Sequence, residues 1–503
     1  MTAGGAGYLF KISDTKAIVG VSDIPYSSFS EPDVIISRNG VLATALRVGE
    51  TSISLRGPAA VRSERTRCYN GGIPGPTLEV SPGDELRIRL INQLGPNQDS
   101  DHGLEQVNGP HGFNTTNLHT HGLHVSPQSP GDNPFLAIEP GSEYHYTIRL
   151  PQSHPPGTFW YHPHSHGSTA LQVMNGMAGA LIVLEPPDQQ ITVSKDLVWM
   201  IQEIAGREAE NIYTCHPPLP SYTVNGNFQP TLRFRTGELQ RWRFINATAT
   251  PGGYADLQLL NYHGKPERLV LIAVDGYSLR EMQPAQHYVL PPGGRVDFLA
   301  RLDRAGRYQV KKRRVQGHSQ DQTIAWIAVS GSRRNSSLPT HVPSPPPLMR
   351  AITDDEIRQR RILKFQMCPD QARGDTCSRF PDAKPCSAPS TGDLIKGAFL
   401  IDGKPYDPGR TDHSIKLGTA EEWQIINETG SDHPFHIHVN HFQVVRADRR
   451  PQDWLWSDTI SLPADGAVKI RIRFNDHPGR SVLHCHILLH SDMGMMQNFE
   501  VIP

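Results

Sequence analysis

The sequence predicts an all-β protein made of three β-sandwich domains, and three observations support this. Long helical periodicity is scarce, whereas short alternating apolar and polar runs between Gly and Pro are typical of half-buried antiparallel strands, as at residues 85–90 and 469–474. The length of 503 residues suits about three domains of ordinary size. The third observation is an internal threefold repeat.

The repeat consists of three phrases that recur in the same order. The first phrase occupies residues 76–92, 230–246 and, more weakly, 413–427. The second occupies 140–150, 292–302 and 463–474, and the third occupies 156–161, 305–308 and 478–483. Generic β composition would not preserve this order. Three strand–turn–strand copies spaced by about 150 residues therefore predict three similar sandwiches.

Linker composition places the domain boundaries. Residues 185–188 (Glu-Pro-Pro-Asp) close the first copy, and the Pro/Ser-rich stretch 335–349 is typical of an extended spacer. We expect a first domain with an N-terminal extension at 1–186, a second at 187–340 and a third at 341–503.

The charge balance gives no sign of a nucleic-acid or acidic-membrane partner, because the net charge is −1 and the pI is about 7.1. The longest mostly apolar stretch, 177–184, is far shorter than the roughly 20 residues of a membrane span. We expect a monomer that works with small molecules. The N-terminus has no basic segment followed by an apolar one, so no leader is visible. We expect a secreted or periplasmic protein whose leader was removed, with a cytoplasmic location as the alternative.

The chain contains six cysteines. Cys368, Cys377 and Cys386 are close enough in sequence for one short-range disulfide, whose connectivity the sequence leaves open. A disulfide would favour an oxidising compartment. Cys485 differs from the others because it lies between two histidines, which predicts a metal ligand.

Histidine is the residue type that stands out, with 24 copies. Random placement would give about one His-x-His pair, but the chain has five: His119/His121, His162/His164, His164/His166, His436/His438 and His484/His486. In a strand, residues i and i+2 point to the same face, so each pair would aim two imidazoles at one metal or at two neighbouring metals. Imidazole suits copper, iron, nickel and zinc alike.

The C-terminal motif at residues 484–495 selects the metal. Cys485 is followed by His490 five residues later and by Met495 ten residues later. One thiolate, two imidazoles and a weak axial thioether form the ligand set of a blue copper site, and His433 is the candidate for the second imidazole.

Strand alternation then gives the motif a mechanistic meaning. Cys485 would face one side of its strand, while His484 and His486 would face the other. One copper on the Cys side would be covalently connected to two on the His side. This arrangement fits an oxidase that collects electrons at one site and uses them at another. The alternative, a buried free thiol, leaves the flanking histidines unexplained.

Four ordered segments make the sequence resemble the multicopper oxidases, which include laccases, bilirubin oxidases and cuprous oxidases. The segments are HTHG at 119–122, FWYHPHSHG at 159–167, HPFHIH at 433–438 and HCHILLHSDMGM at 484–495. With the repeats, the resemblance covers most of residues 70–503. It implies three cupredoxin-like Greek-key β-sandwich domains and four copper ions, one of type 1, one of type 2 and two of type 3.

The resemblance also implies the copper ligands, position by position. Type 1 copper would bind His433, Cys485 and His490, with Met495 axial; type 2 copper would bind His119 and His436; one type 3 copper would bind His121, His162 and His486, and the other His164, His438 and His484. The first and third domains supply all of these, so the second would be a spacer that shapes the substrate surface. His166 falls outside the ligand set. His102, His111, His124, His154 and His413 are expected to be hydrogen-bonded structural side chains.

Reduction of O₂ to water consumes protons, so a carboxylate is expected near the cluster. Asp132 resembles the acidic residue that the family carries near the type 2 copper; the alternative is a solvated turn residue. Many bacterial relatives carry Glu where this chain has Ser491. Asp458 is a candidate hydrogen-bond partner of a ligand histidine, or else a turn or cap residue.

These features predict a laccase-like oxidase that couples one-electron oxidation of phenols or aromatic amines to four-electron reduction of O₂. Electrons would enter at His490 or His433 and pass through Cys485. One alternative is a metallo-oxidase acting on Cu(I), Fe(II) or Mn(II). A Met-rich segment, typical of cuprous oxidases, is missing from residues 350–430, where Met367 is the one methionine. The other alternative is a non-catalytic cupredoxin relative that serves as a binding or structural protein.

Overall fold

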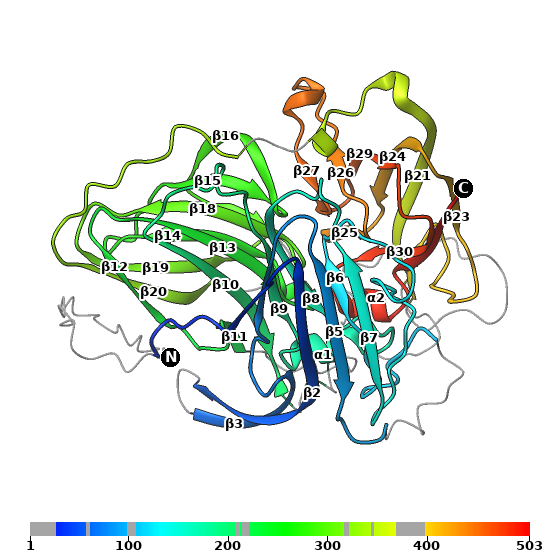
Figure 1. Ribbon diagram of the computed structural model, residues 1–503, viewed down its shortest axis with the longest axis horizontal. Helices are drawn as coiled ribbons and strands as arrows, with labels where there is room; N and C mark the ends of the chain where they lie inside the picture. The colour runs from blue at the N-terminus through cyan, green and yellow to red at the C-terminus, as the bar shows by residue number, and fades with distance from the viewer. Residues whose placement is uncertain are drawn as a thin grey trace, which may run out of the picture.

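The computed structural model describes residues 27–56, 61–97, 107–206, 209, 212, 221–315, 321–343, 347–368 and 398–503. Within these ranges the chain forms three β-sandwiches, which confirms the predicted fold class (Figure 1). His102 and the disulfide expected among Cys368, Cys377 and Cys386 involve residues outside the described part. The predicted domain boundaries remain predictions; the strands of the three sandwiches fall within 34–183, 195–330 and 357–502.

Each sandwich consists of two sheets. In spatial order, the first sandwich has β1 (Val34–Ile36), β4 (Thr77–Val80), β9 (Gly179–Val183), β8 (Gly157–His162) and β6 (His119–His121) in one sheet, and β3 (Val61–Tyr69), β2 (Val41–Arg56), β5 (Glu85–Asn92) and β7 (Glu143–Arg149) in the other. The second has β11 (Ser221–Val224), β10 (Lys195–Ile204), β13 (Leu239–Ala247), β18 (Arg295–Arg301), β15 (Leu269–Val274) and β16 (Tyr277–Ala285), and β12 (Thr231–Arg235), β20 (Gln322–Ser330), β19 (Gly306–Arg313), β14 (Ala255–Leu260) and β17 (Tyr288–Leu290). The third has β22 (Ala398–Ile401), β21 (Ile357–Cys368), β24 (Thr419–Asn427), β29 (Ala467–Phe474), β26 (Phe442–Val444) and β27 (Trp456–Ser457), and β23 (His413–Lys416), β31 (Met496–Ile502), β30 (Gly479–Cys485), β25 (His433–Ile437) and β28 (Thr459–Leu462).

The three repeated phrases of the sequence correspond to equivalent strands. The first phrase forms β4–β5, β12–β13 and β23–β24; the second forms β7, β18 and β29; and the third forms β8, β19 and β30. In every sandwich the strand of the second phrase pairs antiparallel with the longer strand of the first phrase. Alternation explains the packing: along β5, Leu86, Ile88 and Leu90 are buried while Arg87 and Arg89 between them are exposed.

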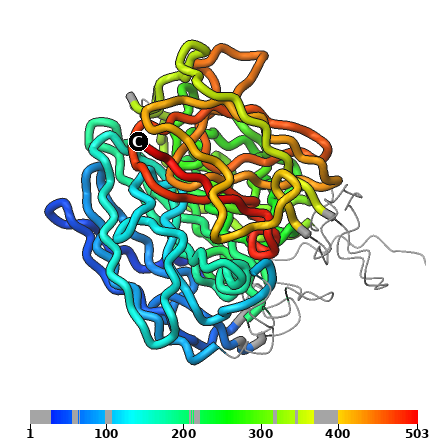
Figure 2. The backbone as a smooth tube through the Cα atoms, turned by 90° about the vertical axis from the view of Figure 1, so that its right-hand side faces the viewer, coloured from blue at the N-terminus to red at the C-terminus, as the bar shows by residue number. Residues whose placement is uncertain are grey.

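The first and third sandwiches lie against each other, as the blue-to-cyan and yellow-to-red parts of Figure 2 show. Two short helices contact each other at this junction, α1 (Thr169–Met174) from the first sandwich and α2 (Leu488–Asp492) from the third. The side chain of Ser168 does not cap α1. Instead, the buried carboxylate of Asp492 accepts hydrogen bonds from the backbone N–H groups of Gly167 and Ala170 at 2.9 and 2.8 Å. The Asp492 side chain of the third sandwich thus caps helix α1 of the first.

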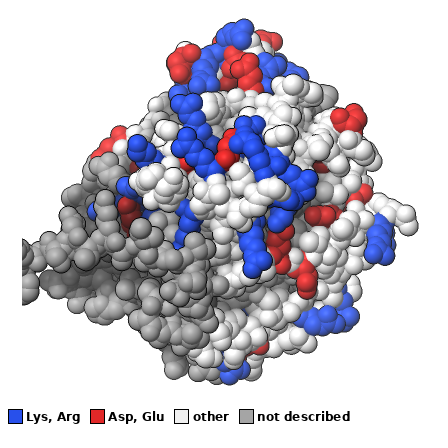
Figure 3. All heavy atoms as spheres, turned by 90° about the vertical axis from the view of Figure 1, so that its left-hand side faces the viewer, with Lys and Arg blue, Asp and Glu red and all other residues white. Residues whose placement is uncertain are grey.

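The second sandwich lies to the left in Figure 1, and Lys and Arg side chains gather on the side of the molecule that it occupies (Figure 3). Ion pairs offset part of this charge: Arg313 lies 2.9 Å from Asp321, and Arg333 lies 2.8 Å from Asp303. Among the described residues, no helix has the length and apolar character needed to span a bilayer.

Candidate metal centre

The predicted ligands gather into four groups of potential metal donors. In each group one donor atom per residue lies within 4.8 Å of the others. The groups are His433, Cys485 and His490; His164, His438 and His484; His121, His162 and His486; and His119, His121 and His436. All of these side chains are buried. The structure therefore brings together the ten histidines and the cysteine that the sequence singled out.

Two pairs of antiparallel strands bring most of these residues together. In β6 and β8, His119 lies opposite His162, and in β25 and β30, His436 lies opposite His484. Both members of four of the five His-x-His pairs enter the donor groups, as expected, but the assumption that each pair lies within one strand was wrong. Of the five His-x-His pairs, only His119/His121 lies wholly within a strand, because β8, β25 and β30 end at 162, 437 and 485.

Backbone hydrogen bonds hold the three histidines that lie just beyond the strand ends. The backbone N–H of His164 donates to the Asn117 side chain at 2.5 Å, and that of His438 donates to the Val482 carbonyl at 3.1 Å. The backbone N–H of His486 donates to the Pro434 carbonyl at 2.7 Å. These three histidine positions are thus fixed by contacts distant in sequence, which no local pattern reveals.

The His164, His438 and His484 group has the spacing of a metal site. The three Nε2 atoms lie 3.1, 3.1 and 3.3 Å from one another. Ligand nitrogens about 2.0 Å from a tetrahedral ion would be about 3.3 Å apart. The Nδ1 atom of His484 donates to the Cys485 carbonyl at 2.9 Å, which leaves its Nε2 lone pair directed at the other two rings. A metal ion fits between these three nitrogens.

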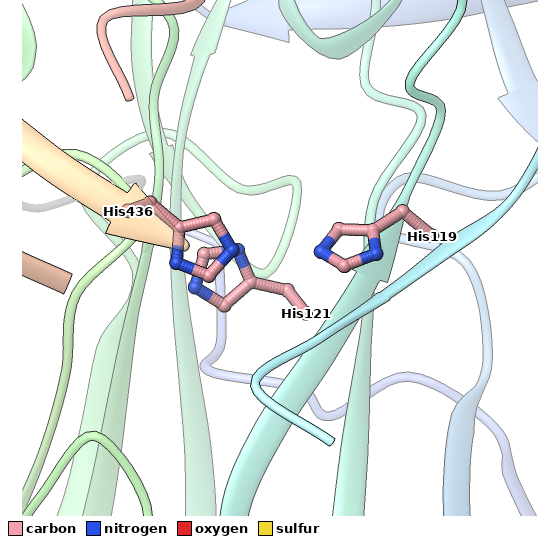
Figure 4. A group of neighbouring side chains, drawn as sticks. All are labelled: His119, His121 and His436. Carbon is pink, nitrogen blue, oxygen red and sulfur yellow. The ribbon is translucent and has the colours of Figure 1, made fainter. Parts of the chain in front are cut away.

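The other two histidine groups fit a metal because they contain buried nitrogens without a hydrogen-bond partner among the described residues. These atoms are Nε2 of His119, His162 and His436, Nδ1 of His121, and both ring nitrogens of His486. Buried polar atoms are normally paired, so orphaned imidazole nitrogens that face one another are typical of a metal site. Figure 4 shows His119 and His121, both from β6, together with His436 from β25; the rings of His121 and His436 stack with centroids 3.9 Å apart.

Burial keeps these imidazoles in the form that binds metal. Desolvation lowers the pKa of His164 to about 4, and neighbouring imidazoles add to the effect. Desolvation likewise lowers the pKa values of His119, His121, His162, His438, His484 and His486 well below the ordinary imidazole value. Neutral imidazole is the ligating species, so the cluster is ready to coordinate at neutral pH.

Asp132 orients one of these histidines. Its carboxylate accepts a hydrogen bond from Nδ1 of His119 at 3.0 Å, from the Thr120 backbone at 3.0 Å and from the Thr120 hydroxyl at 2.7 Å. The side chain is fully buried, so the alternative of a solvated turn residue is wrong. Burial raises the pKa of Asp132 to about 7 despite the Thr120 hydrogen bonds. The contact fixes the His119 tautomer with Nε2 directed into the cluster.

Asp458 performs the same task for two more histidines. Its carboxylate lies 3.1 Å from Nε2 of His121, and its backbone carbonyl accepts a hydrogen bond from Nδ1 of His436 at 2.8 Å. Burial alone would raise the pKa of Asp458, but the charge and hydrogen bonds of Arg295 outweigh burial and hold this pKa below its usual range. Of the roles considered from the sequence, the geometry supports the ligand partner.

Arg295 is the residue that sequence reasoning missed. It lies at the start of β18 in the second sandwich, is fully buried, and pairs with both carboxylate oxygens of Asp458. Its Nε donates to the Thr158 carbonyl of the first sandwich at 3.2 Å, and its Nη2 donates to the Asp275 carbonyl at 2.8 Å. One guanidinium thus ties all three sandwiches together behind two of the cluster histidines.

Gly293 provides a second contact from the same sandwich. Its φ is +84°, and a Cβ at this position would lie 2.6 Å from Cγ of His486. The second sandwich is therefore more than the spacer expected from its lack of His-x-His pairs. Arg295 lies in the repeated phrase at 292–302, but the equivalent residue of the first copy is Glu143, so the repeat did not mark this position.

The Cys485 group lies entirely in the third sandwich. Nδ1 of His433 lies 3.4 Å from the Cys485 sulfur, Nδ1 of His490 lies 3.7 Å from the sulfur, and the two nitrogens are 3.3 Å apart. Nε2 of His433 donates to the Thr429 hydroxyl at 2.9 Å, leaving Nδ1 to face the sulfur. This triangle of two imidazoles and one sulfur fits the trigonal His₂Cys arrangement of blue copper proteins.

The surroundings of this group are mostly apolar. Cys485 belongs to the hydrophobic core of the third sandwich, and desolvation raises the pKa of its thiol. Phe399 stacks on His490 with ring centroids 4.4 Å apart. Met495 is fully buried, and its backbone N–H and C=O bond to the His490 carbonyl and the Cys485 N–H at 2.9 and 3.0 Å. A metal would be needed to stabilise the thiolate here.

Comparisons with known proteins agree with this site. Models of the family described as multicopper oxidase match residues 107–188 and 380–503. The chain is 27% identical to the multicopper oxidase mco of Staphylococcus aureus, over 86% of this chain and 83% of that protein. It is 25% identical to the laccase of Bacillus subtilis, over 86% and 89% of the two chains. The solved structure of a Campylobacter jejuni multicopper oxidase, titled a metallo-oxidase, matches with a TM-score of 0.69 and 23% identity, over 96% and 99% of the two chains.

The fold and the donor groups define an oxidoreductase class in which β-sandwiches carry copper, and the matched segments contain the predicted ligands. The chain belongs to the multicopper oxidase family. Members of this family use copper, and the resemblance drawn from the four sequence segments is confirmed.

Proposed function

We propose that the protein is a laccase-type oxidase that takes single electrons from phenols or aromatic amines and reduces O₂ to water. The observation that carries the proposal is the sharing of three consecutive residues among three donor groups. Cys485 belongs to the sulfur-containing group, His484 to the group with His164 and His438, and His486 to the group with His121 and His162. A mononuclear electron carrier has no use for this connection.

When bound, copper would supply one-electron redox chemistry at the Cys485 group and a site for O₂ reduction at the histidine groups. The residues supply geometry and protons. The peptide chain links the Cys485 thiolate to His484 and His486 with no intervening residue. Asp132, bonded to His119 in the interior, is the carboxylate that we assign to proton delivery, because four protons are consumed for each O₂.

Ser491 does not take over this role. Its hydroxyl lies 3.8 Å from the Met496 sulfur, and the adjacent Asp492 is committed to capping α1. Among the described carboxylates, Asp132 and Asp458 are those hydrogen-bonded to cluster histidines. Asp458 is held ionised by Arg295, so Asp132 is the one suited to exchange a proton.

The test is oxygen uptake by the copper-loaded protein with a panel of phenols and aromatic amines, set beside Cu(I), Fe(II) and Mn(II). We expect uptake with the organic donors. The 25% identity to the laccase of Bacillus subtilis supports this choice of donor. Oxygen uptake with the metal ions but not with the organic donors would instead support the metallo-oxidase.

A thiolate bound to copper gives a visible charge-transfer band. Cys485→Ser should abolish this band and reduce oxygen uptake to background, because a hydroxyl cannot replace the soft thiolate. Cys68→Ser is the matched control, since Cys68 is the other buried free thiol among the described residues. It should keep both the band and the activity. A colourless copper-loaded wild type would favour the non-catalytic binding protein, and activity retained in Cys485→Ser would contradict the electron route.

A further inference from the structure

A second cluster of histidines lies at the junction of the first and third sandwiches, outside the four donor groups. His124 follows β6 in the first sandwich, and Asp476 and His477 lie in the turn between β29 and β30 of the third. One donor atom from each of these three residues lies within 4.8 Å of the other two. The sequence predicted His124 as a structural side chain, and the structure shows that it has acidic and imidazole neighbours.

The hydrogen bonds of His124 show that a cation is needed at this place. Nδ1 of His124 lies 2.5 Å from the carbonyl oxygen of Val439, so this nitrogen carries a proton. In neutral imidazole the other nitrogen, Nε2, then carries a lone pair, yet it lies 2.7 Å from Oδ1 of Asp476. Two acceptors do not face each other at this distance without a proton between them, and a metal ion that replaced this proton would hold the two atoms about 3.3 Å apart.

His477 supplies a third donor aimed at the same place. Its ring lies 4.8 Å from that of His124, and its Nε2 atom is buried without a hydrogen-bond partner among the described residues. Its backbone has a φ of +60°, a conformation that non-glycine residues rarely adopt. The tight turn between β29 and β30 therefore presents Asp476 and His477 together toward His124.

Burial keeps the imidazoles around His124 neutral, which is the form that binds a metal ion. It lowers the pKa of His477, and it lowers the pKa of His154, whose Nε2 accepts a hydrogen bond from the His124 backbone, to about 3. The pKa of His441, whose ring lies 5.2 Å from that of His124, is lowered well below its ordinary value. The Asp476 side chain is 45% exposed, which gives an ion a path from solvent.

We propose that His124, Asp476 and His477 form a binding site for a divalent transition-metal ion such as Zn²⁺, separate from the four donor groups. Two imidazoles and one carboxylate are ligands that Zn²⁺ accepts, and the open side would leave its remaining position to water. The Val439 carbonyl fixes the tautomer of His124, as a hydrogen-bond acceptor behind a metal-binding histidine usually does. The ion would join the first sandwich to the third.

The experiment is equilibrium dialysis of the copper-loaded protein against Zn²⁺, with zinc and copper per chain measured in the same samples. We expect about one zinc bound per chain without loss of copper, and a Tm that rises with zinc concentration because the ion binds only the folded chain. His477→Ala and Asp476→Asn should each weaken zinc binding at least about tenfold. Neither readout depends on oxidase activity, so the result is independent of the proposed function.

A matched control is available in the second sandwich. His287 and Asp256 form an exposed pair with Nδ1 and Oδ1 2.9 Å apart, and His287→Ala should leave zinc binding unchanged. No saturable zinc binding would overturn the proposal, as would binding that persists in His477→Ala or that displaces copper. Indifference to zinc combined with a lower Tm in Asp476→Asn would show that a proton, not a metal, lies between His124 and Asp476, and would also overturn it.

Discussion

The two faces of the segment around Cys485 differ in how much of the molecule builds them. The sulfur face uses His433, Cys485 and His490, all from the third sandwich, in mostly apolar surroundings. The histidine face combines rings from the first and third sandwiches, which are oriented by Asp132 and Asp458 and braced by Arg295 from the second. The sulfur face is built within one sandwich, whereas the histidine face requires all three sandwiches to be correctly placed.

This difference implies that damage to the domain junctions should separate the two faces. Substitution of a residue that supports the histidine groups should remove their copper, while the blue copper of the sulfur group remains. Substitutions on the sulfur face and on the histidine face therefore test whether copper can be lost from one face without the other.

The largest effect is expected from Arg295→Met. The substitution leaves the buried Asp458 carboxylate without its cation, and we expect the free energy of unfolding to fall by about 3–5 kcal/mol. Copper per chain should fall while the visible band per folded chain is retained, as measured by denaturant unfolding, metal analysis and absorbance. Arg301→Met is the control, because Arg301 ends the same strand at the surface and pairs with Asp303 at 3.0 Å. Loss of the visible band together with the copper of the histidine groups would contradict the claim that the two faces are built independently.

Gly293→Ala should act on the same face with a smaller effect. The new Cβ would lie 2.6 Å from Cγ of His486, at a φ of +84° that disfavours alanine. We expect about 1–3 kcal/mol of destabilisation and a lower copper content with the visible band intact. Gly264→Ala separates strain from the clash, because Gly264 has a φ of +70° and no atom within 4 Å of the position that a Cβ would take. Equal copper loss in both variants would argue against the His486 contact.

Asp132→Asn should leave stability and colour nearly unchanged. An amide can keep some of the hydrogen bonds to Thr120 and His119 but cannot exchange a proton as a carboxylate does. We expect O₂ reduction to slow by about 10–100-fold in stopped-flow reoxidation. Asp448→Asn, at an exposed carboxylate of the third sandwich, should have no effect. Unchanged turnover in Asp132→Asn would remove Asp132 from the proton route.

Phe399→Leu probes the sulfur face and should have the smallest effect. Phe399 stacks on His490 with centroids 4.4 Å apart, and leucine keeps most of its volume. We expect about 1 kcal/mol of destabilisation and a small shift of the visible band, with copper at the histidine face unaffected. Copper loss at the histidine face in this variant would show that the two faces are coupled.

The sequence predicted the fold and the donors for definite physical reasons. Alternation along residues 85–90 and 469–474 marked strands that the structure confirms as parts of β5 and β29. His-x-His and His-Cys-His spacings are local in sequence, so the donor residues could be found without a structure. Their division among four metal sites still depended on family resemblance.

What could not be predicted depends on contacts between distant parts of the chain. Arg295 and Asp458 are 163 positions apart, and nothing in the local pattern at either site reveals their pairing. The positions of His164 and His438 beyond their strand ends depend on Asn117 and Val482. The cluster of His124, Asp476 and His477 was missed for the same reason, because its members come from two sandwiches.

The most direct test of the central claim is an anomalous-difference map at the copper absorption edge, from crystals of the fully loaded protein. We predict one peak bounded by His433, Cys485 and His490, and separate peaks within the histidine groups that His484 and His486 join. Copper found on one face of the Cys485 segment alone would contradict the claim that this segment connects two kinds of copper site.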